Sequence, residues 1–185
     1  MFEVAPPELV LVDELTIRRY ESSDVALLHD AIIDSTEHLT PWMAWMSLEP
    51  HSLSDRARVL ESWIGQWDNC EDFLMGVFVD DELVASTGLH PRGGLDVVEI
   101  GYWVRVRHVK QAVATRVVNA LTSIAFETWA HIDRVEIHID ANNIRSVRVA
   151  ERCGYLLSGF EERAPQAPGE SGRLLHWKKD RPADY

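Results

Sequence analysis

Cysteine is scarce in this sequence, and the two cysteines form no recognisable motif. Cys70 and Cys153 lie far apart, with neither a C-x-x-C pair nor the spacing of a zinc site. Cysteine this scarce is typical of proteins of the reducing cytoplasm, where we expect the chain to act. Four histidines are also scattered without the spacing of metal ligands: His38, His90, His138 and His176. We therefore expect no metal.

Long hydrophobic runs and excess positive charge are absent as well. No apolar stretch approaches the roughly 20 residues that span a bilayer, and the N-terminal segment MFEVAPPELVLVDE lacks the basic and apolar regions of a signal peptide. With 18 Lys and Arg against 30 Asp and Glu, the formal net charge is -12. Phosphate backbones favour partners of the opposite sign, so we expect neither a nucleic-acid nor a membrane partner. The acidic surface either attracts cationic acceptors or only keeps the protein soluble.

Composition and pattern indicate one folded domain over residues 1–185. The chain is 46% hydrophobic and 26% charged, which is ordinary for a globular protein, and its length suits a single sizeable core. There is no internal repeat. The one loose stretch is APQAPGESG, residues 164–172, which we interpret as a loop between two late strands.

Strand and helix periodicities alternate along the chain. Strands are predicted at residues 15–20, 73–79, 83–90, 96–106, 134–140, 155–162 and 173–178. Helices are predicted from residues 25 and 53 onwards, at 111–129 and at 143–152. Gly154 would end the last of these helices. This order predicts an α/β fold with a mixed sheet of about six or seven strands and helices on both faces.

The sharpest charge anomaly lies between Glu99 and Val118, where a strand runs through a short basic turn into a long amphipathic helix. The free backbone N–H groups and the positive dipole end of such a helix suit a pyrophosphate. Four basic residues add local positive charge: Arg105, Arg107, His108 and Lys110. The turn either binds phosphate or is a solvated loop with ordinary surface charges.

The most specific pattern in the chain is RVEIHIDANNIRSVRVAERCGY, residues 134–155. Four further segments accompany it: LTIRRYESSD, HLTPWMAWM, EIGYWV and ATRVVNALTSIAF. Together they resemble the GNAT superfamily of N-acetyltransferases, most closely its RimJ/RimL-like branch of ribosomal-protein N-terminal acetyltransferases, over nearly the whole chain. The resemblance implies the GNAT fold, acetyl-CoA as co-substrate, and an amine acceptor that is a small molecule or a protein N-terminus. It leaves open whether the chain forms a homodimer.

The resemblance also assigns residues to the cofactor. The family's CoA loop, Q/R-x-x-G-x-G/A, aligns with residues 109–114, where valine replaces the usual Arg or Gln and Ala112 replaces the central Gly. The resemblance implies that the pantetheine amides pair with the backbone of Trp103, Val104, Arg105 and Val106. It implies that the pyrophosphate contacts Val109, Lys110, Gln111, Ala112, Val113 and Ala114. Further implied cofactor contacts are the Thr115 hydroxyl, Asn143 and Ser146. Because alanine disfavours positive φ, the altered loop leaves open whether CoA binds normally. The alternative to an active enzyme is an acyl-CoA-binding or regulatory module with weakened or lost catalysis.

Glu99 and Ser146 are the candidate catalytic residues. Several GNAT relatives carry a carboxylate base at the strand position of Glu99, which would take the ammonium proton through a water; the alternative is an ion-paired glutamate. The family's matching serine lies near the CoA sulfur, so Ser146 would stabilise or protonate the thiolate unless it only bonds to the local backbone. Asp96 is a weaker candidate base. Ala150 stands where many relatives carry a tyrosine general acid.

Trp42 and Trp45 lie in the segment that lines the acceptor site of the RimJ/RimL-like branch. Their aromatic faces would hold a cationic amine or a peptide; the alternative is packing in the core. The expected function is transfer of an acetyl group from acetyl-CoA to an amine by direct attack in a ternary complex, with Trp42, Trp45 and Glu99 facing the acceptor. The identity of the acceptor is not readable from the sequence.

Overall fold

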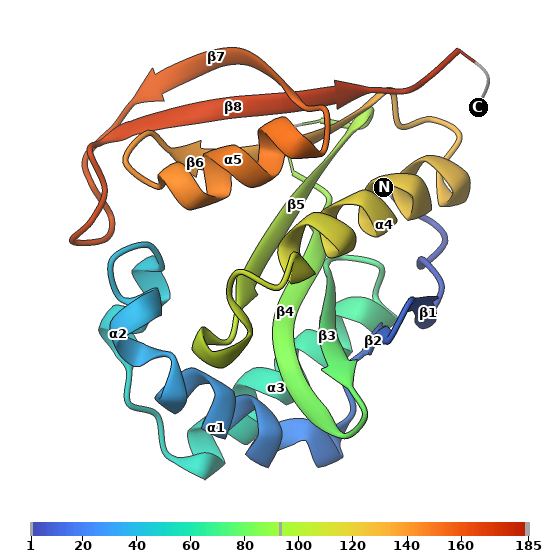
Figure 1. The fold of residues 1–185 in the computed structure, drawn as a ribbon. Helices are drawn as coiled ribbons and strands as arrows, with labels where there is room; N and C mark the ends of the chain where they lie inside the picture. Colours follow the sequence, from blue (N-terminus) through green and yellow to red (C-terminus); the bar gives the residue numbers. More distant parts are fainter. Residues whose placement is uncertain (1, 93, 184–185) are drawn as a thin grey trace.

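The computed structural model describes residues 2–92 and 94–183, which form one eight-stranded sheet in the order β1-β2-β3-β4-β5-β6-β8-β7 (Figure 1). All neighbouring strands are antiparallel except β5 and β6, which are parallel. The strands are β1 (Leu9–Val12), β2 (Leu15–Arg19), β3 (Phe73–Val79), β4 (Glu82–His90), β5 (Val97–Val104), β6 (Arg134–Asp140), β7 (Leu156–Glu162) and β8 (Arg173–Asp180).

The sheet is one strand larger than the predicted six or seven. The additional strand, β1, forms a hairpin with β2, and Asp13 in the turn has a φ of 52°. The LVLV sequence of β1 shows no polar–apolar alternation, although the strand lies at an edge of the sheet and is only partly buried. A four-residue edge strand without alternation carries no periodic pattern that identifies it in the sequence.

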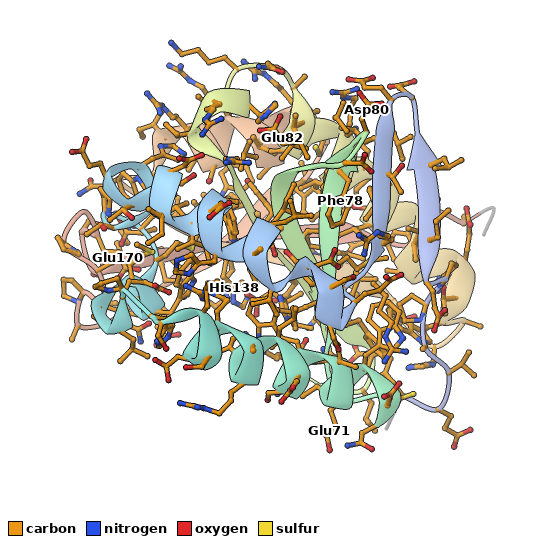
Figure 2. The ribbon with its side chains drawn as sticks, turned by 90° about the horizontal axis from the view of Figure 1, so that it is seen from below. Glu71, Phe78, Asp80, Glu82, His138 and Glu170 are labelled. Atoms are coloured by element: carbon orange, nitrogen blue, oxygen red, sulfur yellow. The ribbon has the colours of Figure 1, made fainter. Side chains whose placement is uncertain are left out.

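Helices cover both faces of the sheet, as predicted. α4 (Val113–Thr128) and α5 (Ile144–Arg152) lie on one face, and α1 (Val25–Asp34), α2 (Thr36–Leu39) and α3 (Leu53–Asp68) lie on the other. Figure 2 shows α1 and α3 in front of the sheet from below. Short 3-10 turns complete the fold: η1 (Ser22–Asp24), η2 (Ala44–Leu48) and η3 (Val106–His108). No helix in the described residues has both the length and the apolar character needed to cross a membrane.

Each face of the sheet has a hydrophobic core. On the α4 side, Val117, Leu121 and Ala125 recur at helical spacing and pack on the sheet. On the other side, Leu28 of α1 and Leu60 of α3 belong to a second cluster. β4 is buried along nearly its whole length because helices cover both of its faces.

Pairing between β5 and β6 stops after three residue pairs, the last of which joins Glu99 to Glu136. Beyond this point β5 remains paired only with β4, and β6 remains paired only with β8. The facing edges of β5 and β6 therefore present backbone N–H and C=O groups to the space between them. Because such groups need partners where water is excluded, this splay is a preformed binding edge.

A buried ion pair fastens the segment after η2 to α3. Arg56 Nη2 lies 2.5 Å from Glu49 Oε1, and the two side chains are only 3% and 4% exposed. The Glu49 carboxylate also accepts the backbone N–H of His51 at 2.8 Å. Burial raises the pKa of Glu49, but the hydrogen bonds from Arg56 and His51 outweigh burial and hold that pKa below its ordinary value. Loss of Arg56 would leave the buried Glu49 charge without its cationic partner.

We expect Arg56→Leu to lower the free energy of unfolding by about 3–5 kcal/mol, because breaking a buried pair leaves an uncompensated charge. Urea unfolding measures this loss. Because the folded pKa of Glu49 is lowered, the loss is present at neutral pH and shrinks as the pH falls below about 4.3, the ordinary pKa of glutamate.

The matched control for this variant is Arg58→Leu on the same helix. Arg58 is exposed and pairs with Asp55 near the surface, where solvent screens the interaction, so little change in unfolding is expected. Equal losses in the two variants would contradict a special role for the buried pair.

Candidate active site

Two cavities meet at the splay between β5 and β6. The larger cavity, of about 650 Å³, lies between the sheet and the segment from η2 to α3. The smaller cavity, of about 300 Å³, lies between β5 and the N-terminal ends of α4 and α5. Six residues line both cavities: Trp42, Met43, Tyr102, Trp103, Asn143 and Ser146. A molecule in one cavity would therefore touch a molecule in the other.

The smaller cavity gathers most of the residues predicted to bind cofactor. Its lining includes Trp103, Val104, Val109, Lys110, Ala112, Val113, Ala114, Thr115, Asn143 and Ser146. Arg105, Val106 and Gln111 were also predicted there but do not line it. β5 ends at Val104, two residues earlier than predicted, and the chain turns away because the N–H of Val106 binds the Ser35 hydroxyl at 3.0 Å.

The basic cluster predicted at this turn is largely neutralised by acidic residues from other elements. Arg105 is buried and its guanidinium binds Asp34 of α1 and Glu82 of β4. Arg107 also pairs with Asp34, and His108 Nε2 lies 3.2 Å from Glu82. The Arg105 hydrogen bond holds the pKa of Asp34 below its ordinary range. Arg105 and Arg107 thus anchor the turn to the rest of the fold. Sequence analysis could not identify this role because their partners, Asp34 and Glu82, are distant in the sequence.

Positive charge reaches the smaller cavity from α5 instead. Arg145, Arg148 and Arg152 are exposed and line this cavity. None of the three has an ion-pair partner among residues 2–92 and 94–183. Sequence analysis did not single them out, although their i, i+3, i+7 spacing places them along one side of a helix. These three arginines, rather than Arg105 and Arg107 of the turn before α4, place positive charge beside the smaller cavity.

In the turn before α4, residue 112 has a backbone conformation that glycine favours, although it is an alanine. Ala112 is left-handed, with φ 58° and ψ 12°, and Lys110 has a φ of 67°. Ala112 is the N-cap of α4 and makes no side-chain hydrogen bond there. The first N–H groups of the helix have no acceptor within the helix, and they belong to residues that line the smaller cavity. The departure from the family loop thus leaves the backbone arrangement for an anion in place.

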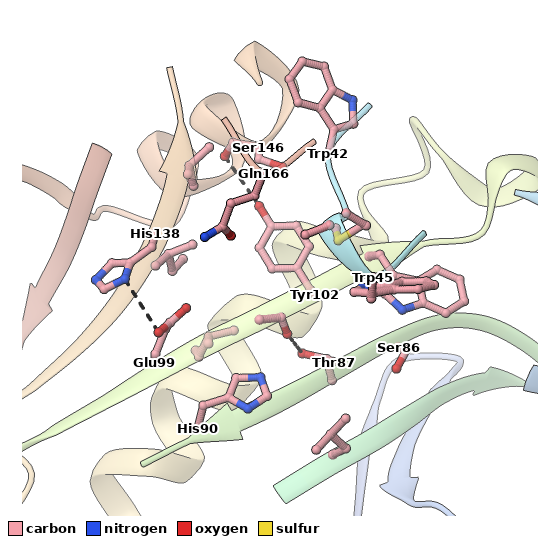
Figure 3. A pocket seen from close by; sticks show the side chains of 18 of the residues that line it. Trp42, Trp45, Ser86, Thr87, His90, Glu99, Tyr102, His138, Ser146 and Gln166 are labelled. Carbon is pink, nitrogen blue, oxygen red and sulfur yellow. Dashed lines mark hydrogen bonds and ion pairs between the residues drawn. The ribbon is translucent and has the colours of Figure 1, made fainter. Parts of the chain in front are cut away.

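Asn143, Ser146 and Tyr102 meet where the cavities join. Asn143 is the N-cap of α5, and its Oδ1 accepts the N–H of Ser146 at 3.3 Å. The Tyr102 hydroxyl donates to the Ser146 carbonyl at 3.5 Å (Figure 3). Burial raises the pKa of Tyr102 to about 12, so the phenol is neutral at physiological pH. Sequence analysis missed Tyr102 because it points to the face of β5 opposite Glu99, where only the splay opens a cavity.

Glu99 faces the larger cavity from β5 (Figure 3). Its Oε2 lies 3.6 Å from Nδ1 of His138 on β6. The carboxylate therefore has an ionisable partner, as the ion-pair interpretation requires, and it also borders the cavity, as the role of a base requires. Asp96 lies before the strand, pairs with Arg134 at 3.4 Å and does not line the cavity.

A histidine–aspartate pair that sequence analysis did not identify lies beside Glu99. His90 is the direct cross-strand neighbour of Glu99, and its Nδ1 lies 2.5 Å from Asp72 Oδ1. The His90 ring lies over Gly88 and Gly101, where a Cβ on either would come within 2.9 Å of it. The two glycines therefore make room for the imidazole in the floor of the larger cavity.

Aromatic and acidic side chains form the remaining wall of the larger cavity. Trp42 and Trp45 are partly exposed and line it, so they are not buried core residues. The ring of Trp45 lies 6.5 Å from that of Trp103. Carboxylates outnumber guanidinium groups in the lining: Glu49, Asp72, Glu99, Asp140 and Glu170 against Arg56, Arg92 and Arg163. The cavity therefore suits a cationic guest with an apolar part.

Ala112→Gly tests whether the loop is strained. We expect it to raise the free energy of unfolding by about 1 kcal/mol, because a left-handed conformation costs an L-residue that amount and glycine almost nothing. Ala114→Gly, two residues into α4, should instead lower it by roughly 0.5–1 kcal/mol. Urea unfolding of both variants decides the signs, and a destabilised Ala112→Gly protein would refute the strained conformation.

A family model described as acetyltransferase (GNAT) domain matches residues 14–156. Among curated proteins, the probable N-acetyltransferase YjcK of Bacillus subtilis (strain 168) is 29% identical over 94 residues. This match covers 49% of the present chain and 51% of YjcK, so the chain spans about half the length of the curated relative it matches.

Solved acetyltransferases share the fold. The microcin C7 self-immunity acetyltransferase MccE, in complex with acetyl-CoA and AMP, has a TM-score of 0.84 at 20% identity, over 92% of this chain and 94% of MccE. RimL, a ribosomal L7/L12 alpha-N-protein acetyltransferase in complex with CoA, also has a TM-score of 0.84, at 18% identity over 94% and 98% of the two chains. The predicted GNAT fold is confirmed, and because the family model covers most of its residues, the chain belongs to the acetyltransferase (GNAT) domain family.

Proposed function

We propose that residues 1–185 form one N-acetyltransferase domain that moves an acetyl group from acetyl-CoA to an amine in a ternary complex. The observation that carries the proposal is the junction of two cavities at the β5–β6 splay, one lined by free helix N–H groups and arginines, the other by Glu99. Direct transfer needs both reactants at one point. The six residues that line both cavities support such a point.

The smaller cavity fits a CoA-type donor in three respects. The unpaired edge of β5 at Trp103 and Val104 offers backbone groups to pantetheine amides. The amides at the start of α4 and the dipole of a 16-residue helix suit a pyrophosphate. Arg145, Arg148 and Arg152 add charge for further phosphate oxygens. When bound there, acetyl-CoA supplies an activated thioester.

The chain's own residues would carry the protons of the reaction. Glu99 takes a proton from the ammonium group, directly or through one water, because only the neutral amine has a lone pair for attack. As the new C–N bond forms and the C–S bond breaks, the nitrogen would lose its surplus proton and the departing thiolate would gain one. The Ser146 hydroxyl would stabilise that thiolate with a hydrogen bond. Tyr102 positions Ser146 by holding its carbonyl.

The acceptor is a cationic amine with an apolar neighbouring group. The acidic excess of the larger cavity attracts the ammonium ion, and Trp42 and Trp45 offer faces for it or for an attached side chain. A small amine and a protein α-amino group both meet this description. The net charge of -12 argues against a nucleic-acid partner, and the two cysteines in 185 residues support a cytoplasmic location.

A binding or regulatory module with lost catalysis is the second candidate. Its support is the altered loop, in which Val109 and Ala112 replace two family residues. Against it, Ala112 already has the left-handed conformation that a glycine would adopt. Calorimetry with acetyl-CoA and release of free CoA thiol across a panel of amines distinguish the candidates. Binding without release favours the module, whereas the absence of binding at millimolar concentrations refutes both.

We expect Glu99→Gln to lower kcat by roughly 10²–10⁴-fold, as loss of a general base does, while the affinity for CoA stays unchanged. Glutamine keeps the size of the side chain and removes only the basic oxygen. Asp96→Asn is the matched control, because Asp96 lies near the same strand but outside the cavity, and it should keep nearly full activity. Thiol-release kinetics measures both variants, and full activity in Glu99→Gln would exclude its role as the base.

The proposal includes a homodimer through β7. This strand is at one edge of the sheet, and Leu156, Leu157 and Phe160 on it are 68%, 53% and 52% exposed. A long apolar edge strand is a template for pairing with a second copy.

The double substitution Leu157→Lys and Phe160→Lys should therefore convert a dimer into a monomer, as measured by light scattering. Leu11→Lys on β1, the opposite edge, should leave the dimer intact. A monomeric wild-type protein would contradict this part of the proposal.

A further inference from the structure

Glu136, His138 and His176 form a cluster on β6 and β8, next to the candidate active site. Of the three, only His138 lines one of the two cavities. His138 and His176 are direct cross-strand neighbours, with ring centroids 4.3 Å apart. Glu136 lies two residues before His138 on β6, and therefore on the same face of the sheet. One ligand atom from each of the three residues lies within 4.8 Å of the other two. Among the described residues no other group of three has this property.

One ring nitrogen in this cluster has no partner. His176 Nε2 is buried and accepts or donates no hydrogen bond within the described part of the chain. A buried polar atom without a partner is costly in free energy. The other two members are engaged with each other, since His138 Nε2 lies 2.9 Å from Glu136 Oε2. A cation between the three residues would give His176 the partner that it lacks.

We propose that Glu136, His138 and His176 bind a divalent transition-metal ion of the zinc type. Two imidazoles and one carboxylate are a ligand set that Zn²⁺ uses with a water as its fourth ligand, whereas Mg²⁺ and Ca²⁺ prefer oxygen ligands alone. Zinc bonds of about 2.0–2.1 Å bring tetrahedral ligand atoms to roughly 3.4 Å from one another. The ligand atoms now lie within 4.8 Å of one another, so binding would require rotations of the three side chains toward the ion.

Arg134 engages one carboxylate oxygen of Glu136, and the other oxygen faces the cluster. Arg134 Nε binds Glu136 Oε1 at 2.7 Å, so the ion would bind Oε2 in place of the contact from His138 Nε2. Lys178, the cross-strand neighbour of Glu136, directs its ammonium to Asp180 at 3.1 Å.

Occupancy of this site would reach the active site through His138. Its Nε2 faces Glu136 and its Nδ1 faces Glu99. A metal on Nε2 leaves the proton on Nδ1, and histidine ligands commonly donate that second N–H to a carboxylate. Glu99 is that carboxylate here, so zinc would hold it away from the amine and inhibit transfer. This coupling rests on the proposed function of Glu99, whereas metal binding itself does not.

The binding test is calorimetric titration of Zn²⁺ into the chelator-treated full chain. One equivalent should bind, and His176→Ala and Glu136→Gln should each weaken it roughly 10-fold or more. Circular dichroism verifies that the variants are folded, and Zn²⁺ should raise the melting temperature of the wild type only. His131→Ala is the control, because His131 is exposed and outside the cluster. No binding by the wild type, or equal binding by His176→Ala, overturns the site.

The coupling test compares turnover with and without Zn²⁺. The wild type should lose activity in proportion to occupancy, and His176→Ala should keep its activity at the same metal concentration. Full activity of the zinc-loaded wild type overturns the coupling to Glu99. If no amine is acetylated at all, the proposed function fails, and calorimetry still decides the metal site.

Discussion

The early end of the pairing between β5 and β6 is the constraint on which the rest of the site depends. After Glu99 and Glu136 the two strands share no hydrogen bonds, and each keeps only its outer partner. Their free edges would be unfavourable if the space between them were closed and dry. Two cavities occupy that space instead, so the same break in the sheet creates both the proposed donor site and its junction with the proposed acceptor site.

Interactions far from the cavities hold this arrangement in place. Arg105 is buried at the end of β5 and ties it to Asp34 of α1 and to Glu82 of β4. The turn after β5 is therefore fixed before α4 begins, which directs the amides at the start of that helix toward the splay. On the other side, the buried pair of Arg56 and Glu49 fastens the segment that carries the cavity tryptophans to α3. Arg105 and Arg107, which the sequence suggested as part of a phosphate site, instead pair with Asp34 and hold the turn in position.

The regular elements were predictable because their periodicity reflects burial. The loop at residues 109–114 and the helix α5 were predictable as neighbours of one cavity because the residues of each are contiguous. What could not be predicted depends on contacts between remote segments. Asp34 neutralises a turn some seventy residues away, and His138 meets His176 only through the register of two strands. Tyr102 was missed for a related reason. Strand alternation places its side chain on the face of β5 opposite to that of Glu99, and no local sequence feature shows that β5 and β6 separate there. The strand β1 is too short to carry a pattern.

The shared wall of the two cavities also limits how the proposed enzyme can change in evolution. A substitution among the six residues that line both cavities would alter the fit of the proposed donor and acceptor together. Selection for a new amine would thus act mainly on positions that only the larger cavity uses, such as Trp45 and His90. Residue identity should therefore vary more among related sequences at those positions than at the six positions that line both cavities.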